Sequence, residues 1–344
     1  MNEEGSTIIP ARPAALLFGV PIDDVTMPEA IETIAELVRI GRSTGRTHQV
    51  ATVNVDFLVN ALADAKLHRI LRHSDLNLAD GMPLLWAAQF CGTPLRERVA
   101  GADLVPELAA QAAGRGWRIH LFGATDGVAE HACEVLRERH PGAALTAWGG
   151  PLLTDVEHVD DEVLARIAAK HADILCVALG NPKQERFIEA NRDRLGIPVM
   201  IGIGGSLDML VGHKRRAPKW AQRFGMEWAF RAAQEPLRLG RRYAHDAVVF
   251  FPRLTTEVVR AWRTRRGATL DRWASDAQRL SDGQPVVVDL SGIERLSRQG
   301  TAQLVDLSRR ARRAQSAFRA QGCSPMLGDR LALDRAEAPS NAAD

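Results

Sequence analysis

The stretch that decides the fold is DILCVALGNPKQE, residues 173–185. Its run of apolar residues predicts a buried strand over residues 173–179, which Gly180 ends in a turn. Pro182 favours the start of a helix, and we expect that helix from about Lys183. Strand, glycine turn and helix in this order are typical of a βαβ unit in a parallel sheet.

The same order recurs along the chain. Further strands are expected at residues 48–55, 76–78, 117–123 and 199–203, each followed by polar residues or glycine. The repeats predict an α/β fold with a Rossmann-like, mostly parallel sheet flanked by helices. Ligands of such sheets bind beyond the carboxyl ends of the strands, and the polar turns of this chain lie there.

Composition indicates a folded protein, because 46% of the 344 residues are hydrophobic and 25% are charged. The net charge is only +2, but the positive charge is concentrated. Between Val211 and Arg266 there are 14 Lys and Arg residues against 4 Asp and Glu residues. Such a basic block suits phosphates, nucleic acid or anionic lipid.

The four cysteines are scattered without metal-ligand spacing, which predicts reduced thiols in a cytoplasmic protein. The first ten residues are polar and acidic and lack the pattern of a secretory signal. No apolar run reaches the roughly 18 residues that a membrane-spanning helix needs. Any contact with a membrane is therefore expected to be peripheral.

Polar residues that follow the early strands, and an arginine beside a later glycine turn, are candidate site residues. Thr52 and Asn54 point to the same side of a strand, so both could hold a substrate. Asp80, in ADGMP at 79–83, could act as a general base. Arg98, beside a glycine turn, could bind a diphosphate with two hydrogen bonds. The structural alternatives are strand-end capping, an Asp-Gly turn and a surface salt bridge.

Two later turns offer backbone amides, a cation and polar side chains for a nucleotide. Their candidate residues are Gly180, Lys183, Gln184, Glu185, Gly204, Gly205 and Asp208. An ordinary first helical turn is the alternative for the earlier of the two. The loop GATDG at 123–127 lacks the G-x-G-x-x-G pattern, which argues against an NAD-dependent oxidoreductase.

Beyond Ala217 the pattern changes to basic helices. A helix is expected over Trp220–Ala247, with Pro252 closing it and a further helix over Thr255–Arg266. The candidate cations of this segment are Arg231, Arg238, Arg241 and Arg242. They could face lipid phosphates on a membrane surface, or water on a helix packed against the core.

In their order and spacing these motifs resemble the WecG/TagA/CpsF family of glycosyltransferases over about residues 15–250. The matching segments are TVNVDFLVNA (52–61), ADGMPLLW (79–86), RVAGAD (98–103), ALGNPKQE (178–185), IGGSLDMLVG (203–212), RAPKW (216–220) and EWAFRAAQEPLRLGRRY (227–243).

The resemblance implies an inverting transfer of a hexose or N-acetylhexosamine-type sugar from a UDP-sugar to an undecaprenyl-diphosphate-linked saccharide. The product would enter cell-surface polysaccharide or exopolysaccharide synthesis. The resemblance further implies no cofactor, no metal and no nucleic-acid partner. It places the protein on the inner face of the plasma membrane, as a possible homo-oligomer.

Roles follow from the motif match. Asp80 is implied as the base, with Thr52 and Asn54 in the same pocket and with Arg98 and Gln184 on the reacting sugar or diphosphate. The residues implied on the nucleotide side are Gly180, Lys183, Glu185, Gly204, Gly205 and Asp208. The residues implied on the acceptor and membrane side are Arg231, Arg238, Arg241 and Arg242.

The chain is expected to divide into an N-terminal tail (1–14), the transferase core (15–215), a basic helical appendage (216–266), a small α/β module (270–335) and a disordered tail (336–344). Residues 285–313 resemble part of a STAS domain, with Arg298 at the position of the phosphorylated serine. That match implies docking of a protein partner. It leaves open an alternative function, a catalytically inactive scaffold or regulator that binds a polysaccharide-assembly partner through this tail.

Overall fold

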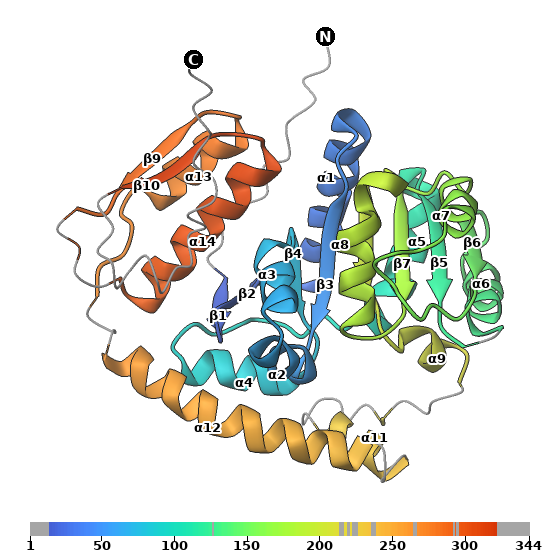
Figure 1. Cartoon of the computed structure of the whole chain (residues 1–344), viewed down its shortest axis with the longest axis horizontal. Helices are drawn as coiled ribbons and strands as arrows, with labels where there is room; N and C mark the ends of the chain where they lie inside the picture. The colour runs from blue at the N-terminus through green and yellow to red at the C-terminus, as the bar shows by residue number, and fades with distance from the viewer. Residues whose placement is uncertain are drawn as a thin grey trace.

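The computed structural model describes residues 14–125, 127–212, 217–218, 221, 226–234, 239–263, 267–291, 293 and 296–321. A six-stranded parallel sheet forms its centre (Figure 1). The strands stand in the order β4 (Leu76–Ala79), β3 (His48–Val53), β8 (Val199–Gly202), β7 (Ile174–Ala178), β5 (Arg118–Gly123) and β6 (Ala144–Trp148). The predicted α/β fold with a mostly parallel sheet is confirmed.

Helices cover both faces of the sheet, because successive side chains of a strand point to opposite faces. In β7, Ile174 and Cys176 pack against one layer of helices, and Leu175 and Val177 pack against the other. The first layer contains α1 (Met27–Thr44), α5 (Gly101–Arg115), α6 (Val128–Arg139) and α9 (Ser206–Leu210). The second contains α2 (Val55–Ala63), α3 (Ala65–His73), α4 (Met82–Phe90), α7 (Asp161–Ala168) and α8 (Lys183–Leu195).

A small hairpin, β1 (Ala15–Leu17) and β2 (Val20–Ile22), covers the edge of the sheet beside β4. Its two-residue turn has positive φ at both Phe18 (+51°) and Gly19 (+82°), which matches the twist of a tight hairpin. The backbone N–H of Asp23 donates to the carbonyl oxygen of Asn77 at 2.9 Å, and the N–H of Asn77 donates to the Asp23 carboxylate at 2.7 Å. These bonds occupy polar groups that an edge strand would otherwise expose.

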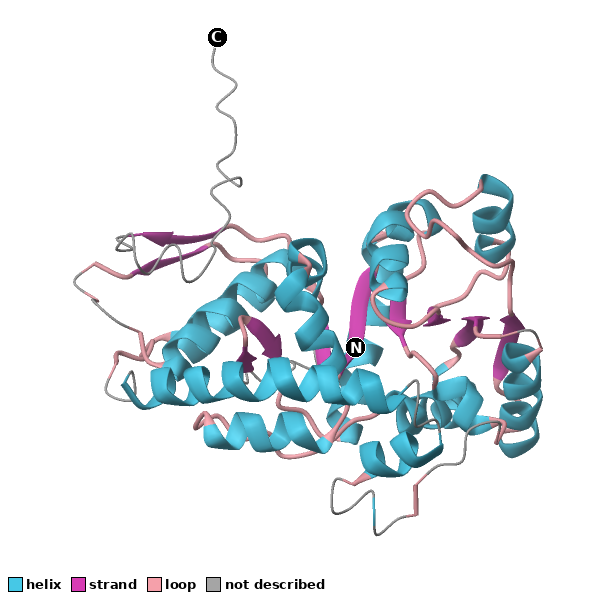
Figure 2. Ribbon diagram, turned by 60° about the horizontal axis from the view of Figure 1, so that its bottom comes forward, coloured by secondary structure: helices cyan, strands magenta, loops and turns pink. Residues whose placement is uncertain are grey.

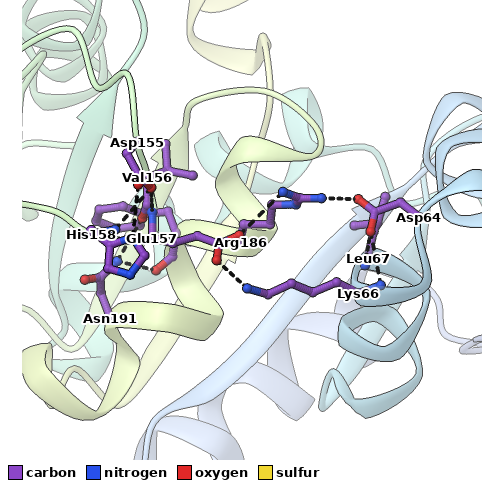
Figure 3. A network of polar contacts seen from close by, with 10 residues as sticks. Asp64, Lys66, Leu67, Asp155, Val156, Glu157, His158, Arg186 and Asn191 are labelled. Atoms are coloured by element: carbon purple, nitrogen blue, oxygen red, sulfur yellow. Dashed lines mark hydrogen bonds and ion pairs between the residues drawn. The ribbon is translucent and has the colours of Figure 1, made fainter.

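The outer side of α8 is fastened to two neighbouring segments by a polar network (Figure 3). Arg186 of α8 pairs with Asp64, the N-cap residue of α3, and lies 3.5 Å from Glu157 in the loop after β6. Lys66 of α3 pairs with the same Glu157 carboxylate. The network therefore holds the helix that follows the 180–185 turn from its outer side.

Two helices, α11 (Glu227–Gln234) and α12 (Arg241–Arg263), follow the sheet domain and lie along one side of the molecule (Figure 1). The prediction that Pro252 closes a helix is wrong, since α12 continues through it to Arg263. Proline removes the hydrogen bond to the carbonyl of Val248, four residues earlier. Val248 is 73% exposed, so water can take the place of the missing donor.

The C-terminal module consists of α13 (Trp273–Ser281), β9 (Val286–Asp289), α14 (Arg298–Arg313) and β10 (Phe318–Gln321). Strands β9 and β10 pair in parallel and stand apart from the main sheet (Figure 2). They share a separate apolar core with the two helices, which includes Leu280, Leu290, Leu304 and Leu307. Ser297 is the N-cap residue of α14, and its hydroxyl accepts from the N–H of Gly300 at 2.9 Å.

Two helical glycines provide a test of this packing. A Cβ atom added to Gly41 of α1 would lie 2.7 Å from the Cα of Pro198, whereas one added to Gly114 of α5 would meet nothing within 4 Å. Alanine is favoured over glycine in a helix by about 1 kcal/mol, so Gly114→Ala should raise the free energy of unfolding by about that amount. Gly41→Ala should lower it by roughly 1–3 kcal/mol through overpacking.

Chemical unfolding of the two single variants measures both effects. Stabilisation by both substitutions would contradict the close approach of α1 to Pro198, the residue before β8.

Candidate functional site

A pocket of about 300 Å³ lies between the carboxyl ends of β3 and β4 and the helix α12. Its polar lining consists of Asn54, Asp56, Asp80, Arg98, Glu227, Arg242, Tyr243 and Asp246. Its apolar lining comes largely from α4 and α12 and includes Met82, Trp86, Phe90, Phe250, Phe251 and Leu254. An apolar cavity with a few converging polar groups is the usual form of a small-molecule site.

Parallel pairing brings the first two predicted site residues together. Val53 of β3 is the register partner of Ala79 of β4, so the residues that follow, Asn54 and Asp80, emerge at the same edge. The Asn54 side chain caps α2 by accepting from the N–H of Phe57 at 3.3 Å. After Asp80 the chain turns into α4 through Gly81, whose φ of +139° favours glycine.

Arg98 lies between the core and the appendage. Its guanidinium is 3.2 Å from the carboxylate of Asp103 on α5 and 3.2 Å from that of Glu227 on α11. The N-cap of α5 is Ala100, and Asp103 lies in the first turn of the helix. Two carboxylates thus hold the Arg98 guanidinium at the pocket wall, where it could meet an anionic ligand.

A second cation, Arg242 of α12, also lines the pocket. Its Nε atom lies 3.8 Å from the Asp56 carboxylate, and its guanidinium stacks over the Tyr243 ring at 5.2 Å. Burial raises the pKa of both Asp56 and Asp246 above the ordinary value of an aspartate. The pocket therefore combines several carboxylates with two arginines, an arrangement suited to proton transfer and to binding a diphosphate.

A buried polar network lies at the ends of β7 and β8, beside this pocket. The Gln184 side chain accepts from the N–H of Gly204 at 2.9 Å and donates to Glu185 at 2.7 Å. Asn181 donates to the other Glu185 oxygen at 3.0 Å, and Asn60 of α2 donates to Asn181 at 2.8 Å. The network joins the 180–185 turn both to the end of β8 and to the helix that borders the pocket.

Other predicted residues lie around this network. Gly180 and Gly204 have positive φ values of +76° and +54°, so both turns need the conformational freedom of glycine. Lys183 is exposed at the first position of α8. Gly205 precedes α9, and Asp208 lies within it.

Thr52 is placed differently from Asn54. Its side chain is buried, and its hydroxyl donates to the carbonyl of Gly202 at 2.8 Å, which ties β3 to β8. Thr52 is not among the described residues that line the pocket. In the appendage, Arg241 is exposed at the start of α12. The side chain of Arg231 and all of Arg238 lie outside the described residues.

Three pocket carboxylates were not predicted from the sequence: Asp56, Glu227 and Asp246. Asp56 and Glu227 lie in the first turns of α2 and α11, where acidic residues are common because they complement the helix dipole. The only available signal was the position of Asp56 two residues after Asn54.

In the part of the chain that the structure describes, no group of three or more His, Cys, Asp or Glu side chains is arranged to hold a metal ion. Nor does any helix of that part have the length and hydropathy to cross a membrane.

Comparison with known proteins gives a family match over residues 15–266, to the glycosyl transferase WecG/TagA/CpsF family. The chain is 31% identical over 192 residues to an N-acetylglucosaminyldiphosphoundecaprenol N-acetyl-beta-D-mannosaminyltransferase of Bacillus spizizenii, covering 56% of this chain and 73% of the relative. It is 30% identical over 225 residues to a protein of the same name from Staphylococcus aureus, covering 65% of this chain and 86% of the relative.

The buried Glu185 predicts how stability depends on pH. Burial raises the pKa of Glu185 to about 7 from an ordinary value of 4.5, so the folded state keeps this proton to higher pH than the unfolded state. The free energy of unfolding should therefore fall as pH rises from about 4.5 to 7. Glu185→Gln removes this ionisation. The decrease in the free energy of unfolding with pH should then be smaller by on the order of 2–3 kcal/mol.

Denaturant unfolding measured between pH 5 and 8 gives the slope of the free energy of unfolding against pH. Glu189→Gln, a partly exposed position on the same helix, is the matched control and should retain the slope of the unmodified protein. Identical pH profiles for the two variants would contradict the predicted proton uptake by Glu185.

Proposed function

Because the chain belongs to the WecG/TagA/CpsF family of glycosyl transferases, we propose that it moves a sugar from a UDP-sugar to an undecaprenyl-diphosphate-linked saccharide. The transferred sugar is a hexose or an N-acetylhexosamine, and the reaction is inverting and independent of metal. The names of the relatives favour N-acetylmannosamine as donor sugar and lipid-linked N-acetylglucosamine as acceptor. The product enters cell-surface polysaccharide or exopolysaccharide synthesis.

The observation that carries the proposal is that Asp80 shares one pocket with Arg98 and Arg242. Inversion requires a single displacement at the anomeric carbon. The Asp80 carboxylate takes the proton of the acceptor hydroxyl while the hydroxyl oxygen bonds to that carbon. The bond from the same carbon to the diphosphate oxygen breaks, and UDP leaves. Asn54, beside Asp80, orients the acceptor hydroxyl.

Arginines stabilise the leaving diphosphate in this proposal. Arg98 is already oriented by Asp103 and Glu227, so little reorganisation precedes its contact with the developing charge. Gln184 holds the Gly204 amide beside the site, and Thr52 supports the site from within the sheet. The residues assigned to the nucleotide side are Gly180, Lys183, Glu185, Gly204, Gly205 and Asp208.

An exposed apolar stripe supports a peripheral position on the inner face of the plasma membrane. Val248, Phe251, Val259 and Trp262 repeat at helical spacing on α12, and all are exposed. Trp86, Phe90 and Phe251 are exposed and also line the pocket, so the pocket mouth opens onto this apolar surface. A lipid-linked acceptor can enter the pocket from such a surface. Arg231, Arg238, Arg241 and Arg242 are proposed to meet lipid or acceptor phosphates.

We further propose that the C-terminal module is STAS-like, that the chain self-associates and that the module docks a protein partner. The parallel β9–α14–β10 unit supports the first of these. Arg298 of that match begins α14, and its side chain lies outside the described residues.

Substituting the base tests the function directly. Asp80→Asn should lower turnover by about 100- to 10,000-fold, because the amide cannot accept the acceptor proton. Binding of the donor should persist, so UDP, and not NAD, should still raise the melting temperature of the variant. Turnover is measured as UDP release from a panel of UDP-sugars, with and without a short-chain undecaprenyl-diphosphate-N-acetylglucosamine analogue.

Asp193→Asn, an exposed position on α8, is the matched control. Acceptor-dependent UDP release from one donor would identify the sugar. Normal turnover in Asp80→Asn would remove Asp80 from the role of base. No release from any donor by the folded protein on vesicles would favour the scaffold alternative.

The apolar stripe predicts vesicle binding. Replacing both Val248 and Trp262 with Glu should reduce sedimentation with anionic vesicles, because two exposed apolar side chains become charged without disturbing the core. Leu152→Glu, at a residue that is 91% exposed in a distant loop, should bind vesicles as the unmodified chain does. Equal loss in both variants would show that any added negative charge suffices.

A further inference from the structure

The C-terminal module is joined to the core by a buried arginine. Arg309 on α14 is 2% exposed, and arginine is almost never buried to this degree unless it is paired. Its two terminal nitrogens each donate to an oxygen of the Asp23 carboxylate at 3.0 Å, and its Nε donates to the carbonyl oxygen of Ser74 at 2.9 Å. This bidentate geometry fixes the direction of α14 as well as its distance from the core.

A second arginine lies one helical turn further along α14. Arg313 donates to the backbone carbonyl of Asp75, and its Nε atom lies 3.7 Å from the Asp75 carboxylate. That carboxylate also accepts from the N–H of Gln49 at 3.0 Å and lies 3.1 Å from the ring of the buried His48. Both arginines therefore dock at the amino ends of β3 and β4, the opposite end of these strands from the pocket.

Two connections lead from this dock to the pocket. The first is the β1–β2 hairpin, which Asp23 follows directly and against which α14 packs. At the hairpin turn, the Phe18 ring packs edge-on against Phe250 of α12, with ring centroids 5.4 Å apart. Phe250 lines the pocket. The second connection is the chain itself, since α12 ends at Arg263 and α13, the first helix of the module, begins at Trp273.

We infer that the C-terminal module is a positioning element, which holds α12 over the acceptor side of the pocket and depends on Arg309 for its docking. Arg309 touches no substrate and acts through α14 and the hairpin. The family match ends at residue 266, so the module lies beyond the matched transferase region. The catalytic part of the inference rests on the proposed function, whereas the mechanical part does not.

The first variant is Arg309→Met, which keeps side-chain length and removes the ion pair. The Michaelis constant for the lipid-linked acceptor should rise by about three- to tenfold, a usual size for coupling between separate sites. That for the UDP-sugar should not change. Hydrogen exchange of residues 241–263 should accelerate, while that of β5 and β7 should stay the same.

A second variant separates positioning from simple destabilisation. In Arg309→Met the Asp23 carboxylate is left buried without its cation, which destabilises the fold. Adding Asp23→Asn removes that charge, so the double variant should recover thermal stability. Its Michaelis constant for the lipid-linked acceptor should stay raised. Arg272→Ala, which removes a 76% exposed guanidinium from the same module, is the matched control and should behave as the unmodified chain.

Two results would overturn the inference. One is unchanged exchange of residues 241–263 in Arg309→Met although α14 itself exchanges faster, which would show that the module does not hold α12. The other is a double variant in which both the thermal stability and the Michaelis constant for the lipid-linked acceptor return to the values of the unmodified chain. If no variant and no unmodified protein transfers sugar, the exchange experiment still decides the mechanical inference, and only the proposed function fails.

Discussion

The parallel pairing of β3 with both β4 and β8 is the constraint on which the candidate site depends. Register places Val53 beside Ala79 and Ala51 beside Gly202, so three chain segments leave the sheet at one edge. Asn54, Asp80 and Gly204 follow those strands. A slip of one residue in β4 would turn its side chains to the opposite face of the sheet and carry Asp80 away from the pocket.

Both arginines of the pocket already have carboxylate partners within the protein. Arg98 lies between two carboxylates, and Arg242 lies near Asp56. Because burial raises the pKa of Asp56 and Asp246, their negative charge is costly in this environment. An anionic ligand in the pocket would therefore share these cations with protein carboxylates.

The sequence predicted the sheet and part of the site because parallel strands buried on both faces are continuous apolar runs, and polar residues that interrupt them stand out. Asn54 and Asp80 were found in this way, whereas Arg98 was found beside a glycine turn; all three line the pocket. Asp56 and Asp246 lie on helices, where a carboxylate is ordinary until tertiary packing buries it. Pro252 misled the helix prediction because local rules do not include solvent on the exposed side of α12. The pairing of Arg309 with Asp23 joins residues far apart in sequence and has no local pattern.

The pocket mouth has a consequence for how two unlike substrates meet. Trp86, Phe90 and Phe251 lie both on the exposed apolar surface and in the pocket wall. With this surface on a bilayer, a long-chain acceptor would diffuse in the plane of the membrane and present only its head group to the cavity, while its tail stays dissolved in lipid. The nucleotide sugar of the proposed reaction would arrive from water. The reaction would then take place at a phase boundary, and collisions with the acceptor would depend on its surface density rather than its concentration in solution.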